Sequence, residues 1–193
     1  MERAPQAVRQ RLVKAATALE NAGLQYAVIG GNVVGLWVAS VDEAAVRNTR
    51  DVDLLVSREQ WAEVCEAMKA EGFVFRRAAS LDMFLDPAGS GKAVDAVHVI
   101  FAGEHVDDRQ VLPNPSLGKV TLLDGIRVIG LQELVRMKLD AWTLKDRLHL
   151  EDLQGVGLLD AGPMESLPDQ LRERYESISG EIGEAPGRGG QSI

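Results

Sequence analysis

The sequence feature that most constrains the fold is a short apolar segment that begins with two aspartates, DVDLLV at residues 51–56. Its valines and leucines predict a β-strand, and side chains two residues apart on a strand lie on the same face. Asp51 and Asp53 would therefore place two like charges side by side in an element that disfavours aspartate. The pair either lies at a solvated strand end or a turn, or it binds a divalent cation, because carboxylate oxygens suit Mg²⁺ or Mn²⁺.

A glycine pair precedes this segment. The apolar run 26–29 predicts a buried strand, Gly30-Gly31 follows it, and residues 32–39 predict a helix. Glycines at such a junction let the backbone approach a ligand closely, and the free N–H groups of a helix N-terminus favour an anion. Asn32 adds a side-chain donor. The alternative is an ordinary tight turn.

A third aspartate, Asp95, lies in the apolar run AVDAVHVIF (93–101), which predicts another strand. A buried carboxylate is costly without a partner, so Asp95 either joins the first two aspartates around a metal ion or accepts a structural hydrogen bond from a nearby loop. His98 follows three residues later, so we expect it on the opposite face of this strand. We interpret it as a core or surface histidine.

Composition narrows the class of protein. A chain of 193 residues with 46% hydrophobic and 26% charged residues supports one folded core, and its net charge of −8 disfavours a broad nucleic-acid surface. The single cysteine excludes an internal disulfide framework and a cysteine zinc cluster. No apolar window is long enough to span a membrane, and the N-terminus lacks the apolar core of a signal peptide. We expect a cytoplasmic protein with no membrane partner.

The order of elements predicts an α/β (α+β) fold, with a mixed β-sheet flanked by helices and a C-terminal helical bundle. We expect a core at 1–130, a helical segment packed on it at 131–180 and a disordered tail at 181–193. Further helices are predicted at 5–22, 58–71, 131–144, 147–159 and 168–178, and further strands at 73–76, 81–85, 119–123 and 126–129, the last two closed as a hairpin around Asp124-Gly125.

Together these segments resemble the nucleotidyltransferase superfamily typified by polymerase beta. The matching motifs are IGGN (29–32), RDVDLLV (50–56) and AVDAVHV (93–99). Arg47, Thr49 and Asp51 also match the Arg-x-Thr-x-Asp introduction of a small bacterial branch. The spacing departs from the family: nineteen residues separate Gly31 from Asp51, which implies an insertion at 39–45.

A later segment, residues 126–153, resembles the helical motif of the abortive-infection nucleotidyltransferase toxins. In that motif one helix carries a lysine, and a Lys-Asp…Asp cluster follows it. Lys138 matches the first lysine, and Lys145, Asp146 and Asp152 match the cluster.

The resemblance implies two-metal transfer of a nucleoside monophosphate from a nucleoside triphosphate, such as ATP, to a hydroxyl of a small molecule, a tRNA or a protein. Asp51 and Asp53 would bridge two Mg²⁺ (or Mn²⁺) ions, and Asp95 would hold one of them and act as general base. The phosphates would be bound by Gly30, Gly31, Asn32, Lys138 and Lys145. Arg47 and Thr49 would support the site, and Asp152 would orient Lys145 or cap the bundle.

Two other classes of function are weighed against this one. The segment GGNVVG loosely resembles a dinucleotide-binding fingerprint, but Asn32 replaces its middle glycine and the acidic residues begin a strand instead of ending one. A protein of the same fold that binds a nucleotide or metal without turnover is the stronger alternative. It includes a toxin–antitoxin component, whose partner would be an antitoxin or a second copy of the chain.

Overall fold

A seven-stranded mixed β-sheet organises the chain, in the order β3-β4-β5-β2-β1-β7-β6. The computed structural model describes residues 3–47, 49–78, 81–88, 95–159 and 166–180. The predicted tail and part of the predicted turn at 87–91 lie outside these ranges. The strands are β1 (Tyr26–Ile29), β2 (Val52–Val56), β3 (Val74–Ala78), β4 (Leu81–Leu85), β5 (Val97–Phe101), β6 (Val120–Leu123) and β7 (Ile126–Ile129).

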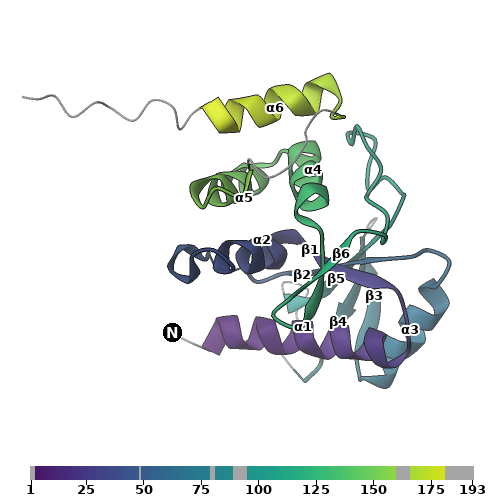
Figure 1. Ribbon diagram of the computed structural model, residues 1–193. Coiled ribbons are helices and arrows are strands. Elements are labelled where there is room, and N and C mark those ends of the chain that lie inside the picture. Colours follow the sequence, from purple (N-terminus) through teal and green to yellow (C-terminus); the bar gives the residue numbers. More distant parts are fainter. Residues whose placement is uncertain (1–2, 48, 79–80, 89–94, 160–165, 181–193) are drawn as a thin grey trace, which may run out of the picture.

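Helices cover both faces of this sheet. Figure 1 shows α1 along one side and the three C-terminal helices gathered on the other, next to α2. The expected α/β fold with C-terminal helices is confirmed. The helices are α1 (Arg3–Asn21), α2 (Gly30–Ala39), the short 3₁₀ helix η1 (Glu43–Ala45), α3 (Trp61–Ala70), α4 (Leu131–Ala141), α5 (Leu144–Gly155) and α6 (Asp169–Gly180).

The strand that begins just after Asp51 is central in the sheet. β2 pairs antiparallel with β1 and parallel with β5, and every residue of β2 except Asp53 is buried. A strand covered on both faces favours a continuous apolar run, which explains why Leu54, Leu55 and Val56 follow one another. Asp53 is the exception to this pattern, and the candidate site is therefore sought around it.

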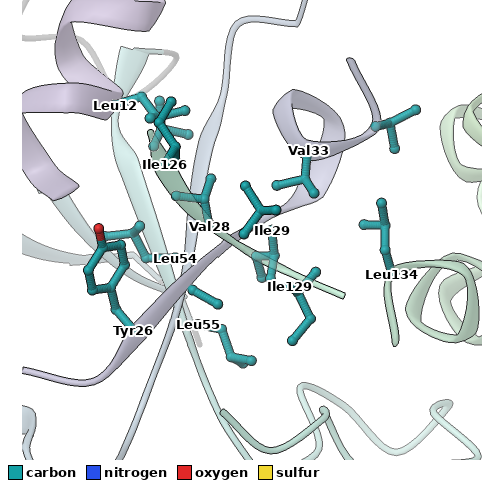
Figure 2. Packing of buried hydrophobic residues seen from close by; sticks show 14 of the residues in the cluster. Leu12, Tyr26, Val28, Ile29, Val33, Leu54, Leu55, Ile126, Ile129 and Leu134 are labelled. Atoms are coloured by element: carbon teal, nitrogen blue, oxygen red, sulfur yellow. The ribbon is translucent and has the colours of Figure 1, made fainter. Parts of the chain in front are cut away.

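The core lies on both sides of this central pair of strands. Figure 2 shows Leu12 of α1 beside Ile126 of β7 on one side, and Leu134 of α4 approaching Val33 and Ile129 on the other. Each fully buried aliphatic side chain of this kind contributes about 1.5–3 kcal/mol. Apolar packing thus holds the C-terminal helices against the sheet and fixes the space between them.

Several element boundaries differ from the sequence prediction, and those of β5 and of the junction between α4 and α5 have a clear physical reason. The predicted strand 93–101 begins only at Val97, because its pairing with β2 begins at Val52, where β2 itself starts. Asp95 therefore lies before the strand, and residues 93–94 are outside the described part of the chain.

The helix predicted at 131–144 ends at Ala141, because Trp142 adopts a left-handed conformation with φ 49°. Thr143 then starts α5 with a capping box, in which its hydroxyl accepts from the Asp146 N–H and the Asp146 carboxylate accepts from the Thr143 N–H. α5 consequently begins three residues earlier than predicted.

The predicted insertion at 39–45 forms the end of α2 and η1, where the Asp42 carboxylate accepts a hydrogen bond from the Ala44 N–H. Within the described ranges, no helix has the length and apolar character needed to cross a lipid bilayer. The division of the chain at residue 130 remains a prediction.

Candidate active site

The sheet brings Asp53 between two neighbours from different strands. Its register partner on β1 is Ile29, directly before the glycine pair, and its register partner on β5 is His98. The Asp53 carboxylate lies 3.2 Å from His98 Nδ1, measured from Oδ1. The hydrogen bond with Asp53 is the main reason that the pKa of His98 is raised above its usual value. The half-buried imidazole thus has a carboxylate partner. Sequence reasoning set His98 aside.

Gly30 is required by this arrangement. Its φ is +77°, a conformation that L side chains rarely adopt, and a Cβ at this position would overlap the Asp53 carboxylate. A Cβ on Gly31 would come within 2.6 Å of Thr49 Cγ2 and 3.0 Å of His149 Cε1. The glycine pair therefore lets the start of α2 pack closely against both the aspartate strand and α5, which is a structural reason for the motif independent of any ligand.

Asn32 has a defined structural role. Its side-chain amide donates a hydrogen bond to the backbone carbonyl of Asp51. This bond ties the first turn of α2 to the residue that begins the aspartate strand. Asn32 thus has a contact that positions Asp51, and its predicted contact with phosphate remains a prediction.

Asp95 pairs with an arginine of α1. Its carboxylate lies 3.7 Å from Arg11 Nη2 of α1, and Arg11 also donates to the Arg50 carbonyl at 3.4 Å. α1 covers the face of the sheet opposite the C-terminal helices. Among the described residues, no group of three His, Cys, Asp or Glu side chains is placed to hold a metal ion. The expected convergence of Asp51, Asp53 and Asp95 is therefore not observed.

The two lysines predicted to contact phosphate have different surroundings. Lys145 Nζ lies 3.0 Å from Asp51 Oδ2, and both side chains are substantially exposed. Lys138 Nζ lies 2.8 Å from Asp146 Oδ1 in a pair that is almost fully buried. Burial raises the pKa of Asp146, but the charge and hydrogen bond of Lys138 and the bonds from Thr143 outweigh it, so this pKa is lowered overall.

The last predicted members of the site form a cluster beside Asp51. Arg47 Nε lies 2.8 Å from Asp152 Oδ1. Asp152 therefore pairs with Arg47, whereas the sequence predicted that it would orient Lys145 or cap the bundle. Burial raises the pKa of Asp152, and Arg47 opposes this effect. Within the described residues, the buried atoms Thr49 Oγ1 and His149 Nδ1 have no hydrogen-bond partner.

His149 is the most buried member of this cluster, at 6% exposure. Burial, followed by the positive charges of Lys138 and Lys145, lowers its pKa to about 4. The imidazole is therefore neutral at physiological pH. Two buried polar atoms without partners, beside an exposed acid–base pair, are the arrangement expected where a polar ligand completes the hydrogen bonding.

Each of the two aspartates lines a cavity. The larger, about 530 Å³, lies between the sheet and α4 and contains Gly30, Asp53 and His98 on one wall and Met137 and Trp142 on the other. The smaller, about 410 Å³, is lined by Arg47, Thr49, Arg50, Asp51, Lys145, Leu148, His149 and Asp152. Asp53 thus faces the larger cavity and Asp51 the smaller.

The aspartate pair is chemically suited to a divalent cation. Mg²⁺ is commonly bound through one or two carboxylates, with water and substrate phosphates as the other ligands. Asp51 and Asp53 are both partly exposed, and each of them lines a cavity. The space that Gly30 leaves for the Asp53 carboxylate preserves this geometry. These two residues therefore fit a cation that is completed by a bound phosphate.

Comparison with known proteins defines the class of protein. Residues 2–112 match the family model of an uncharacterised nucleotidyltransferase. Because this match covers more than half of the 193 residues, the chain belongs to that nucleotidyltransferase family. A search of the curated proteins found no match.

One of the solved structures that this chain is similar to has a TM-score above 0.5 and supports the fold. An antigenic nucleotidyltransferase-like protein from Paracoccidioides brasiliensis aligns with a TM-score of 0.57 and 13% identity, covering 92% of this chain and 89% of that one. ANT(2'')-Ia in complex with adenylyl-2''-tobramycin aligns with a TM-score of 0.48 and 13% identity, over 90% and 88% of the two chains. The lincomycin-bound lincosamide antibiotic adenylyltransferase LnuA aligns with a TM-score of 0.47 and 13% identity, over 72% and 90%.

Proposed function

We propose that the protein transfers a nucleoside monophosphate from a nucleoside triphosphate to a hydroxyl of a small acceptor, with a divalent cation at Asp51 and Asp53. The observation that carries this proposal is the position of the two aspartates, which lie two residues apart and line two different cavities, Asp53 the larger and Asp51 the smaller. A transfer reaction needs two substrates to approach one point from different directions. Membership of a nucleotidyltransferase family supports the same reaction class.

The smaller cavity is assigned to the triphosphate. Arg47, Arg50 and Lys145 supply positive charge, and Thr49 Oγ1 supplies a donor without a partner among the described residues. The neutral imidazole of His149 supplies a further polar atom that no described residue satisfies. Charged donors of this kind bind phosphate oxygens through short, strong hydrogen bonds.

The larger cavity is assigned to the acceptor. Its volume of about 530 Å³ lies within the usual range of roughly 300–1,000 Å³ for small-molecule sites. Its walls combine apolar groups, such as Met137 and the Trp142 ring, with the carboxylate of Asp53. A cavity of this size favours a small hydroxyl compound over a tRNA end or a protein surface.

The chemistry proposed is displacement at the α-phosphorus. The acceptor oxygen forms a bond to this phosphorus, the bond to the bridging oxygen of the β-phosphate breaks, and pyrophosphate leaves with the bonding electrons. The hydroxyl proton passes to a carboxylate or to water. When bound, the cation would neutralise phosphate charge and lower the pKa of the hydroxyl. Asp51 and Asp53 hold the cation, and Asn32 and Gly30 keep these two aspartates in place.

The test is transfer from labelled ATP, CTP, GTP or UTP, with Mg²⁺ or Mn²⁺, to aminoglycosides, lincosamides, tRNA and the protein itself. Asp53→Asn is expected to reduce transfer by at least a thousandfold, because the cation loses a charged ligand, while the fold persists. The matched control is Asp169→Asn, an exposed aspartate on α6. Equal transfer by wild type and Asp53→Asn in every combination would overturn the proposal.

Asp95→Asn adds a second discrimination in the same assay. The sequence motif assigns Asp95 to the metal site, whereas the structure places it beside Arg11. If Asp95→Asn still transfers the nucleotide, the result supports a site made by Asp51 and Asp53 alone. If Asp95→Asn loses as much activity as Asp53→Asn, Asp95 belongs to the site as well. Circular dichroism of both variants separates a loss of chemistry from a loss of fold.

A second candidate function is nucleotide binding without turnover. It is favoured by one observation, the pairing of both aspartates with groups of the same chain, Lys145 for Asp51 and His98 for Asp53. The resemblance of residues 126–153 to abortive-infection toxins supports one form of this alternative, a cytoplasmic component of a toxin–antitoxin pair. Saturable nucleotide binding by calorimetry, with no product in the transfer assay and with an antitoxin or a second copy recovered as partner, would favour it.

A further inference from the structure

Helix α5 presents one face to the smaller cavity. The residues of α5 that line this cavity have the spacing of a single helical face: Lys145, Leu148, His149 and Asp152. Three of these side chains are polar or charged, and Leu148 is the apolar exception. Phosphate oxygens gain nothing from contact with a leucine, so this position suits a different part of the ligand.

A second leucine extends the apolar surface at this place. Leu144 lies one helical turn before Leu148, and the two residues are 74% and 43% exposed. Of the large apolar side chains that are exposed in the described part of the chain, these are the two that lie one helical turn apart. Single exposed leucines are ordinary on a protein surface, whereas neighbouring ones beside a cavity are typical of a binding site.

The ion pairs at the two ends of this face indicate how a triphosphate would lie along it. Lys145 contacts Asp51 at the start of α5, and Asp152 contacts Arg47 two turns later, roughly 10 Å along the helix. In the proposed reaction the α-phosphate lies at the cation beside Asp51, and the β- and γ-phosphates extend toward Arg47. The nucleoside is attached to the α-phosphate and therefore lies at the start of α5, where Leu144 precedes Lys145.

We propose that Leu144 and Leu148 form an apolar platform that binds the nucleoside of the triphosphate, with the flat face of its base against the two side chains. The inference rests on the proposed function, because it requires the triphosphate in the smaller cavity. Contact between the base and this leucine platform removes apolar surface from water, a gain that a ligand made of phosphate alone does not have. The positive charges of the cavity bind the other end of the same ligand.

The test is calorimetric binding of two ligands to the full chain in the presence of Mg²⁺. One is a nonhydrolysable ATP analogue, and the other is methyl triphosphate, which has the triphosphate and no nucleoside. The wild type is expected to bind the ATP analogue at least about tenfold more tightly than methyl triphosphate.

Replacement of both leucines, Leu144→Ala with Leu148→Ala, should remove most of this difference. Alanine preserves the helix, and the affinity for methyl triphosphate should stay within about twofold of the wild type. Leu122→Ala, which changes an exposed leucine of β6, is the matched control and should keep the wild-type difference. Lys145→Met should weaken both ligands by the same factor, because it removes a phosphate contact.

The outcomes separate this inference from the proposed function. Equal affinity of the wild type for the two ligands, or an unchanged difference in the double leucine variant, overturns the leucine platform and leaves the proposed function standing. Binding of neither ligand to the wild type overturns both. A wild-type dimer that dissociates in the double variant, measured by light scattering, assigns the leucines to an interface between copies and also overturns the platform.

Discussion

Lys138 and Lys145 of the C-terminal helices each form an ion pair with an aspartate, and the two pairs differ in burial. Lys138 and Asp146 join α4 to the start of α5, and both side chains are close to 90% buried. Lys145 of α5 contacts Asp51, the residue just before β2, and more than half of the lysine side chain is exposed. In sequence the two lysines are equal candidates for contact with phosphate.

The difference in burial indicates a different role for each lysine. Asp146 accepts hydrogen bonds from Lys138, from the Thr143 hydroxyl and from the Thr143 N–H, so this pair is part of the junction between two helices. Lys145 has only the Asp51 contact among the interactions of the described residues and can leave it for a ligand. We therefore interpret Lys138 as structural and Lys145 as functional.

The largest expected effect is on stability. Lys138→Met leaves the Asp146 charge buried without its cation, and removal of one partner of a buried ion pair costs about 3–5 kcal/mol. Urea denaturation should show this loss in the free energy of unfolding. Lys145→Met is the matched control, with an expected change within about 0.5 kcal/mol. Equal losses in the two variants would contradict the distinction between the pairs.

An intermediate effect is expected from His149, whose pKa responds to both lysines. Its folded pKa of about 4 lies below the ordinary value of 6.5, so between these pH values the unfolded chain binds more protons than the folded one. The free energy of unfolding should therefore fall as the pH is lowered from 6.5 to 4, by roughly 1–3 kcal/mol from this residue.

The measurement is urea denaturation of the wild type and His149→Gln at several pH values in that window. The variant retains every carboxylate, so the difference between the two curves isolates the imidazole. Parallel curves would show that folding does not lower the pKa of His149.

A smaller effect is expected on ligand binding. Lys145→Met should weaken the binding of a nonhydrolysable nucleoside triphosphate by about tenfold, equivalent to about 1.4 kcal/mol, because one phosphate contact is lost. Calorimetry at two salt concentrations measures this change. Lys119→Met, an exposed lysine that pairs with Glu133, should bind like the wild type. A larger loss in Lys138→Met, in protein shown to be folded, would reverse the assignment of the two lysines.

The smallest effect is predicted for the stability of Asp51→Asn. The exposed pair with Lys145 contributes little, and the change also removes repulsion between Asp51 and Asp53, so the free energy of unfolding should be unchanged or raised by up to about 0.5 kcal/mol. Thermal denaturation monitored by circular dichroism provides the measurement. A loss above 2 kcal/mol would show that the Lys145–Asp51 pair holds α5 to the sheet.

Much of the fold was predictable from sequence because its signals are local. The apolar runs predict the strands, the DG turn predicts the β6–β7 hairpin, and periodic apolar residues predict the helices. The break between α4 and α5 also has a local signal, the Thr143-x-x-Asp146 capping box. Interpreting Asp146 as part of a functional cluster obscured this signal.

The candidate site was less predictable, because its members come from distant segments. Asp51 and Asp53 could be singled out, since a charge pair in an apolar strand violates local preference. The contacts of Asp152 with Arg47 and of Asp95 with Arg11 join residues that are far apart in the sequence. No sequence pattern indicates which oppositely charged residues will be adjacent after folding.

The amino-acid sequence by itself determined the alternation of strands and helices, the glycine pair and the two aspartates that begin the central strand, because these depend on conformational preferences and apolar periodicity over a few residues. The tertiary structure alone decided that His98 lies beside Asp53, that Asp95 pairs with Arg11 of α1, and that Lys138 is buried beside Asp146 while Lys145 is exposed beside Asp51. The physical reason is register. One specific parallel pairing between β2 and β5 sets which side chains share a face, and burial between the sheet and the C-terminal helices then sets which charges are paired.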